Sequence, residues 1–294
     1  MGIWTPAGFH GEKKTKKFFE GWYNKVQSPD GDEAFVFIFG YYASKDGSDR
    51  FPFLMFLDEK REFYGYTRLC MAGFHADKHR YSAVCDNLHF SEEGMKGTFE
   101  VKEKGKRIEF DLKNGELKPW PVTTFQPGVM GPFGLIPFLE CYHGIVSMDH
   151  EVNGYVKVTT LKGEREVEDE VCVQIEGGKG YIEKDWGRGF PHGWVWVQCN
   201  TFPTKDLSLS ASCASVPFMG KSFPGFIVGL QEGPYLHKFT AYAFGKIESL
   251  EADTRSVQWR MSNRTHRLEV TAVAGVVGGE KGGEGEGKEG EGGA

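Results

Sequence analysis

The chain has 294 residues, a length typical of one large or two medium domains. Hydrophobic residues make up 39% and aromatic residues 14% of it, which is enough apolar material for a packed core and excludes disorder for most of the chain. The net charge of −6 makes the chain a poor candidate for binding a phosphate backbone, so we expect no nucleic-acid partner.

The six cysteines are scattered and form no C-x-x-C pair. This spacing predicts reduced thiols in an intracellular protein rather than a zinc site or a disulfide framework. The longest apolar stretches are too short to cross a bilayer, and Met1–Pro6 has no basic head followed by an apolar run. We therefore expect a cytoplasmic protein without a signal, transit or transmembrane segment.

Alternation of apolar and polar residues with a period of two dominates the chain and predicts strands. Ala34–Tyr42 and Phe51–Leu57 are apolar on both faces, as in strands that are covered on both sides. Arg107–Leu112, Ser256–Met261 and His266–Val273 alternate polar with apolar residues. Further strands are expected at Tyr155–Leu161, Val171–Glu176, Trp194–Asn200, Leu207–Val216, Gly225–Leu230 and Phe239–Leu250.

No long segment has the helical period of 3.6 residues, so the pattern predicts an all-β protein of antiparallel barrels or sandwiches with few helices. The Pro- and Gly-rich segment Lys113–Val129 indicates a crossing between two β units, which we expect at residues 1–118 and 119–274. Residues 275–294 are mostly Gly and Glu and are expected to form a disordered tail.

Three segments place large aromatic residues around acids: Phe18–Tyr23, Pro137–Gly144 and Gly180–Gly187. Burial among apolar groups raises the pKa of a carboxyl group, so such an acid stays protonated near neutral pH. It can donate a proton, and nearby aromatic faces can stabilise a resulting carbocation. A salt bridge or a capping role is the alternative for each acid. The candidate acids are Glu20, Glu140, Glu183 and Asp185.

The segment Trp194–Asn200, taken as a strand, has two chemically different faces. Val195, Val197 and Cys199 form an ordinary apolar face. The opposite face combines two indoles with two amides, which suits a mostly apolar pocket with a few polar anchors. A half-exposed strand packed under a loop is the alternative. The residues of this second face are Trp194, Trp196, Gln198 and Asn200.

Histidine spacing gives little support for a metal site. His75 and His79 have the i, i+4 spacing of a zinc-binding helix but lack the catalytic Glu, and nothing fixes the geometry of His143, Asp149 and His150. The sequence also lacks a G-x-S-x-G nucleophile motif and the spacing of a phosphate-binding loop. We expect no metal ion and no cofactor.

These motifs together resemble the tocopherol cyclase family, and the resemblance runs from Thr5 to Val273. The block Phe138–Gly144 with Ser147–His150 is more similar to the shorter bacterial members. The Glu-Lys-Asp-Trp-Gly block, followed by Trp-x-Trp-x-Gln, is its most specific part. The other matching residues are Thr5, Pro6, Phe18–Tyr23, Tyr181, Ile182, Phe190, Pro191 and Asn200.

The resemblance implies a lipocalin-like fold of two β units, related to carotenoid hydratases. It also implies a reaction of vitamin E biosynthesis that uses no cofactor: an alkene in a prenyl tail is protonated, and an oxygen of the hydroquinone closes a chromanol ring. The partner would be a hydrophobic small molecule, a prenylated phenol or quinol. Such chemistry needs a pocket that keeps water away from the cation.

Our hypothesis from the sequence is therefore an intramolecular cyclase, an isomerase. Glu140 is the first choice for the proton donor and Asp185 the second, and His143 or Tyr142 would relay or accept the phenolic proton. Glu183 and Lys184 are expected to form a structural ion pair. The expected substrate-binding residues are Glu20, Trp22, Trp186, Trp194, Trp196, Gln198 and Asn200.

Two other functions fit the same pocket. One is a carrier that binds a hydrophobic isoprenoid without chemistry, because a fold alone implies no reaction. The other is a hydratase that adds water to an isoprenoid alkene. Any peripheral contact with a membrane is expected from aromatic residues at the pocket mouth, because the acidic chain offers no polybasic patch.

Overall fold

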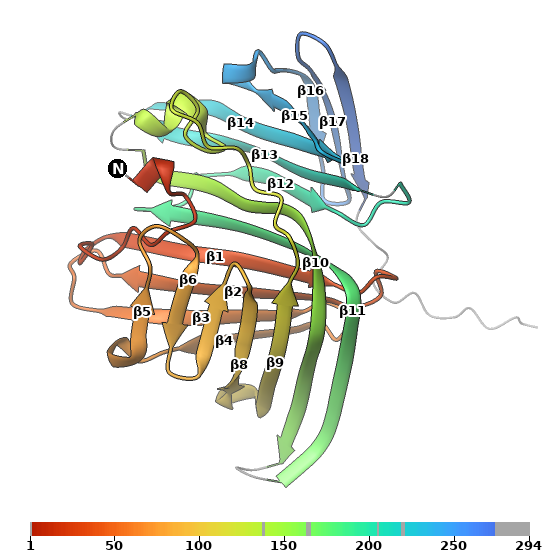
Figure 1. Cartoon of the computed structure of the whole chain (residues 1–294). Helices are drawn as coiled ribbons and strands as arrows, with labels where there is room; N and C mark the ends of the chain where they lie inside the picture. Colours follow the sequence, from red (N-terminus) through yellow and green to blue (C-terminus); the bar gives the residue numbers. More distant parts are fainter. Residues whose placement is uncertain (1, 137–138, 163–165, 205, 219–220, 274–294) are drawn as a thin grey trace, which may run out of the picture.

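The computed structural model describes residues 2–136, 139–162, 166–204, 206–218 and 221–273; the predicted tail, 275–294, lies outside these residues. Within them the chain forms antiparallel sheets and a few short 3-10 helices, which confirms the predicted all-β class (Figure 1). None of the helices in this part of the chain is long and apolar enough to span a bilayer. The helices are η1 (Gly2–Trp4), η2 (Met71–Gly73), η3 (Lys102–Lys104), η4 (Gly131–Leu135) and η5 (Ala241–Ala243).

Eleven strands form one large sheet. In chain order they are β1 (Phe18–Gln27), β2 (Ala34–Ala43), β3 (Arg50–Asp58), β4 (Phe63–Arg68), β5 (Phe74–Ala76), β6 (Ser82–Cys85), β7 (Leu88–Ser91), β8 (Gly94–Val101), β9 (Lys106–Asn114), β10 (Cys141–Lys162) and β11 (Glu166–Gly187). Their order in the sheet is β4-β3-β2-β1-β11-β10-β9-β8-β7-β6-β5.

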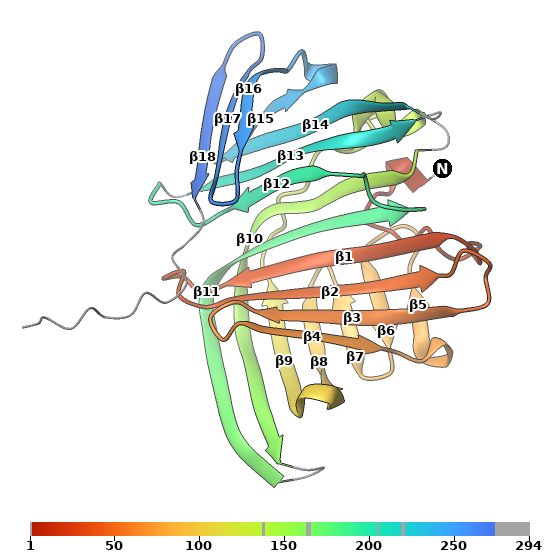
Figure 2. The ribbon, with the colours of Figure 1, turned by 180° about the vertical axis from the view of Figure 1, so that it is seen from behind.

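The large sheet curls around an aromatic core, because alternate residues of each strand point inward. Phe37 and Phe39 of β2 are fully buried. Their rings contact rings from the other half of the sheet, with centroids 4.6 Å apart for Phe37 and Phe110 and 4.8 Å apart for Phe39 and Phe90. Figure 2 shows the result: β1–β4 lie in front of the strands of the other half of the sheet, β5–β9.

Two smaller sheets pack face to face as a sandwich at the other end of the molecule (Figure 1). Leu209 and Val228 on one sheet pack in one apolar cluster with Trp259 and Met261 on the other. The first sheet contains β12 (Trp194–Cys199), β13 (Leu207–Phe218), β14 (Lys221–Glu232) and β15 (Tyr235–Thr240). The second contains β16 (Lys246–Ala252), β17 (Ser256–Ser262) and β18 (Arg267–Val273).

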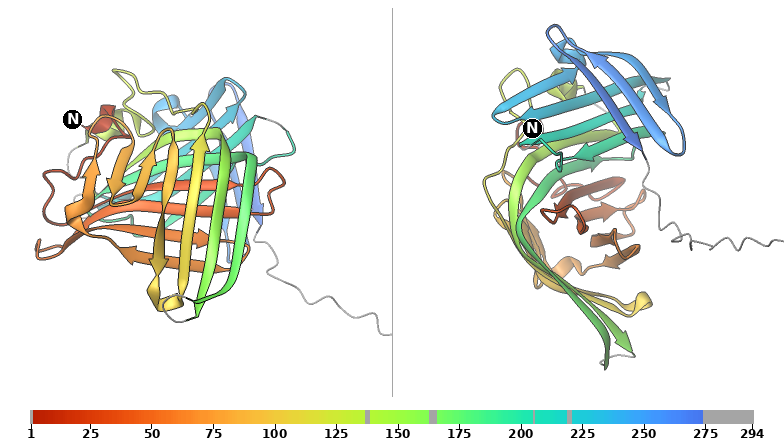
Figure 3. Two further views of the ribbon diagram at one scale, coloured as in Figure 1. Left: turned by 60° about the horizontal axis from the view of Figure 1, so that its bottom comes forward. Right: turned by 90° about the vertical axis from the view of Figure 1, so that its right-hand side faces the viewer.

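The long strands β10 and β11 join the two parts, arching from the sandwich to the far end of the large sheet (Figure 3). The Val152–Thr160 part of β10 pairs with β9. Ile145 and Met148, in the earlier part, pack in one apolar cluster with Trp196 of β12. The predicted division at residue 118 stays a prediction. Strands on either side of it pair in the large sheet, β9 with β10 and β1 with β11.

Every predicted strand overlaps a strand of the structure, but one prediction is wrong in its extent. Phe239–Leu250 is interrupted by η5, followed by Phe244 in the left-handed region with a φ of 59°. The Gly245 N–H donates a hydrogen bond to the Thr240 oxygen and closes this turn. β1 was not predicted as a strand, because its large residues occupy both faces and hide the alternation.

A buried ion pair fastens the N-terminal segment to the inner face of the large sheet. The Lys184 ammonium on β11 pairs with Glu20 on β1, and both side chains are fully buried. Lys184 also donates to the Gly8 oxygen, and the His10 N–H donates to Glu20 at 2.9 Å. The predicted pairing of Lys184 with Glu183 is therefore wrong, because neighbouring residues on a strand point to opposite faces.

Replacing Glu20 by Gln should lower the free energy of unfolding by about 3–5 kcal/mol, because the Lys184 ammonium is left buried without its counter-charge. Urea denaturation followed by far-UV circular dichroism measures this. Glu100→Gln, which breaks the half-exposed pair with Arg107, is the control and should change stability little. Equal stability of Glu20→Gln and the unaltered protein would contradict the assignment.

Candidate functional site

A cavity of about 540 Å³ lies between the outer face of the large sheet and the sandwich. This volume is within the range of sites that enclose a small organic molecule. The large sheet contributes Phe19, Tyr23, Ile38, Phe53 and Met55 to its walls. The sandwich contributes, among others, Trp194, Trp196, Ser212, Ala214, Val216 and Ile227. Met130, Phe133, Ile136 and Leu139 line it from the segment between β9 and β10.

Strand alternation decides which residues reach this cavity. On β11, Glu183 and Asp185 line it, whereas Lys184 lies in the core of the large sheet. On β10, Cys141 and His143 line it. The two strands pair so that His143 lies opposite Asp185, and this register brings an imidazole and two carboxyl groups to one wall.

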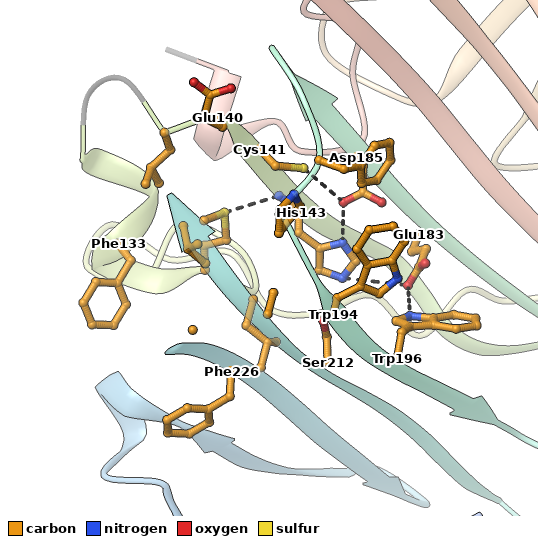
Figure 4. A pocket seen from close by; sticks show the side chains of 18 of the residues that line it. Phe133, Glu140, Cys141, His143, Glu183, Asp185, Trp194, Trp196, Ser212 and Phe226 are labelled. Carbon is orange, nitrogen blue, oxygen red and sulfur yellow. Dashed lines mark hydrogen bonds and ion pairs between the residues drawn. The ribbon is translucent and has the colours of Figure 1, made fainter. Parts of the chain in front are cut away.

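His143, Glu183 and Asp185 form an acid–imidazole cluster (Figure 4). The His143 Nδ1 atom lies 2.9 Å from Asp185 Oδ1, and its Nε2 atom lies 3.8 Å from Glu183 Oε2. Glu183 Oε2 also accepts hydrogen bonds from the Tyr181 hydroxyl at 2.5 Å and from the Trp196 indole N–H at 3.2 Å. Two donors thus fix the orientation of the Glu183 carboxyl group.

The surroundings raise the pKa of two groups of the cluster, Glu183 and His143, above their usual values. Burial raises the pKa of Glu183 to about 6, with the nearby charge of Asp185 adding to the effect and His143 opposing it. Burial lowers the pKa of His143, but the Asp185 and Glu183 carboxylates outweigh this and raise it to about 9. At neutral pH the cluster therefore holds an imidazolium between two carboxyl groups, one of which titrates close to neutrality.

Two of the four predicted catalytic residues, His143 and Asp185, are in direct contact. Glu140 also lines the cavity, but its side chain is 37% exposed and its Oε1 atom lies 3.9 Å from the Lys17 ammonium. Tyr142 points to the opposite face of β10, stacks on Trp186 and donates its hydroxyl to the Ile136 oxygen. The structure thus separates Tyr142 from the other three.

The predicted substrate-binding residues also divide by strand face. Trp194 and Trp196 line the cavity, as expected for one face of β12. Glu20, Trp22 and Trp186 lie on inward-facing positions in the interior of the large sheet, which corrects their predicted place in the pocket.

Gln198 and Asn200 lie beyond the cavity at the end of β12, so the structure corrects their predicted place as well. The Lys25 ammonium donates to Gln198 Oε1 at 3.0 Å and to Asn200 Oδ1 at 3.4 Å. The lining of the cavity on this side includes Trp194 and Trp196 and stops short of Gln198 and Asn200.

Tyr181, Tyr23 and Ser212 were missed by the sequence reasoning. Tyr181 precedes Glu183 by two residues and shares its strand face, so the period of two alone would have found it. Tyr23 and Ser212 come from different sheets and meet only in the folded chain. In the part of the chain that the structure describes, no group of three or more His, Cys, Asp or Glu side chains is placed to hold a metal ion.

Fold and site together define a lipocalin-like β protein with an apolar pocket that carries an acid–imidazole cluster. Residues 92–281 match the sequence profile of the Tocopherol cyclase-like family, and the chain belongs to this family.

The chain is 23% identical over 327 aligned residues to the chloroplastic tocopherol cyclase of Zea mays, an alignment that covers 93% of this chain and 66% of the maize protein. It is 24% identical to the probable chloroplastic tocopherol cyclase of Oryza sativa subsp. japonica, covering 71% of this chain and 52% of the rice protein. The chain thus spans between half and two thirds of these relatives.

Among solved structures, CghA with Sch210972 superposes with a TM-score of 0.51 at 9% identity. The match covers 86% of this chain and 74% of that one, and it shows a shared fold.

The expected peripheral membrane contact stays a prediction. Exposed aromatic side chains that line the cavity include Phe133, Phe190 and Trp194, at 42%, 53% and 58% exposure.

Replacing Asp185 by Asn should lower the pKa of His143 from about 9, because the amide removes a negative charge and a charge-assisted hydrogen bond. NMR titration of the imidazole resonances, assigned by comparison with His143→Gln, measures the shift. Glu140→Gln is the control and should leave the pKa of His143 in place. An unchanged His143 titration in Asp185→Asn would contradict the contact between His143 and Asp185.

Proposed function

We propose that the protein is an intramolecular cyclase that protonates an alkene in the prenyl tail of a phenol or quinol and closes a chromanol-type ring. Membership of the Tocopherol cyclase-like family supports a cyclase- or hydratase-type activity. The proposed protonation and ring closure are supported by the acid–imidazole cluster on one wall of an otherwise apolar, aromatic cavity.

The cavity walls favour a neutral, largely hydrophobic ligand. The lining residues that the structure describes include no Lys or Arg, whereas Glu140, Glu183 and Asp185 all face the cavity. A phosphate or carboxylate group would meet these like charges, and the His143 imidazolium is already paired with Asp185, so burying such a group in a desolvated site is costly. A prenylated phenol carries no such charge, and its tail matches the Phe, Ile and Met side chains of the walls.

Glu183 is the proton donor in this proposal, in place of the sequence-based candidates Glu140 and Asp185. A general acid works best with a pKa near the working pH, and burial raises the pKa of Glu183 to about 6. Glu140 is 37% exposed and faces Lys17, so water reaches it and would quench a cation formed there. Because Tyr181 and Trp196 both donate to Oε2, the Oε1 atom is the one that carries the proton.

The proposed reaction conserves atoms and electrons. Glu183 transfers its proton to one alkene carbon, and the other carbon becomes a carbocation next to the aromatic faces of Trp194, Trp196 and Tyr23. The phenolic oxygen attacks this carbon and forms the new C–O bond. The phenolic proton then returns to the Glu183 carboxylate directly, or the His143 imidazolium gives its Nε2 proton to Glu183 and takes the phenolic proton in its place, while Asp185 holds the ring. The product is an isomer of the substrate.

The test is incubation with a prenylated hydroquinone in deuterated buffer, followed by mass spectrometry. The expected product is a chromanol with one carbon-bound deuterium. Glu183→Gln should lower the rate by about 10²–10⁴-fold, because the amide cannot donate the proton. Glu151→Gln, an exposed residue on β10 outside the cavity, is the matched control and should keep the rate.

Each other outcome points to a different conclusion. A product heavier by one water molecule would make the protein a hydratase, with water as the nucleophile. Retention of unchanged substrate by every variant would favour the carrier. A full rate in Glu183→Gln together with loss of the rate in Glu140→Gln would return the donor role to Glu140.

A further inference from the structure

Among the described residues, two hydroxyl groups of the cavity take no part in the proposed proton transfer and have no hydrogen-bond partner within the chain. They belong to Tyr23 on β1 and to Ser212 on β13, and both residues line the cavity. Both side chains are partly exposed and belong to the cavity wall.

Several other polar side chains of the cavity already have partners. His143 binds Asp185, and Glu183 accepts from Tyr181 and Trp196. The Tyr242 hydroxyl donates to the Val129 oxygen at 2.9 Å. Since both hydroxyls belong to the cavity wall and have no partner among the described residues, a polar atom of a bound ligand can pair with them.

Tyr23 and Ser212 lie on different sheets, yet both adjoin the same indole. The Tyr23 ring packs edge-to-face on Trp196, with centroids 5.5 Å apart. Ser212 is the direct cross-strand partner of Trp196 in the β12–β13 pair, so the two side chains project from the same face. Figure 4 shows Ser212 close to Trp194 and Trp196 on the cavity side. A flat ring lying against Trp196 can therefore reach both hydroxyls.

Tyr23 stays a hydrogen-bond donor at physiological pH. Burial raises the pKa of its hydroxyl well above the usual value, and the charge of Glu183 raises it further. Tyr23 on β1 lies directly opposite Glu183 on β11 in the sheet, so the two side chains project from the same face and line the same side of the cavity.

We propose that Tyr23 and Ser212 are specificity-determining residues that bind the two ring oxygens of a hydroquinone, Tyr23 the oxygen that closes the ring and Ser212 the distal one. This inference rests on the proposed function and adds to it a preference for a ring with two oxygens over a monophenol. Tyr23 orients the attacking oxygen next to Glu183, whereas Ser212 recognises an oxygen that takes no part in bond formation.

The experiment measures binding without turnover. Two ligands with a saturated tail are used, which lack the alkene: a hydroquinone and the matching monophenol without the distal hydroxyl. Quenching of the fluorescence of Trp194 and Trp196 reports binding. The unaltered protein should bind the hydroquinone about 3- to 10-fold more tightly, the ratio expected for one hydrogen bond.

Ser212→Ala should weaken binding of the hydroquinone alone, so that both ligands bind equally. Ser212→Thr, which keeps a hydroxyl, should retain the preference for the hydroquinone. Tyr23→Phe should weaken both ligands and preserve the ratio. Ser215→Ala, on the same strand but outside the cavity, is the control. An unchanged ratio in Ser212→Ala overturns the inference and leaves the proposed function standing. Failure of the unaltered protein to bind either ligand overturns the proposed function and this inference with it.

Discussion

The site depends on the alternation of side chains along one strand, β11. Glu183 and Asp185 face the cavity, and the residue between them, Lys184, is fully buried in the large sheet against Glu20. A shift of one residue in the pairing of β1 with β11 would send the lysine into the cavity and the two acids into the core. The buried pair thus opposes such a shift, because either charge alone in the core would be strongly destabilising.

The same constraint gives chemically identical groups different properties. Burial raises the pKa of Glu20, but Lys184 and His10 outweigh it, and the pKa falls below its usual value. Glu183 lacks a lysine, and burial raises its pKa to about 6. Two glutamates on neighbouring strands thereby serve as a permanent structural anion on one face and as an acid that titrates near neutrality on the other. Environment, and not residue type, assigns these roles.

Periodicity in the sequence was sufficient for the fold class and for most strands, because alternation is a local property that a sheet preserves. It also grouped Trp194 and Trp196 correctly on one face of β12. The predicted ion pair of Glu183 with Lys184 rests only on their adjacency in the sequence. Their opposite directions on a strand follow from the period of two, so the sequence contained the information.

Other parts of the site could not be read from the sequence. The cavity lies between two sheet assemblies, and only their packing brings Tyr23 and Ser212 to the same indole. Aromatic density around an acid was an ambiguous signal, since Trp22 and Trp186 serve the core of the large sheet. Exposure of Glu140 at the cavity edge likewise depends on tertiary contacts, among them that with Lys17.

The proposed role of Glu183 as the acid of the site can be tested by the pH dependence of kcat/KM. This quantity reports the titration of groups in the free enzyme. We expect kcat/KM to fall about tenfold per pH unit above the Glu183 pKa of about 6, because the carboxyl group loses the proton that it must donate. A rate that stays constant to pH 8 and falls only near the His143 pKa of about 9 would contradict it and make the imidazolium the donor.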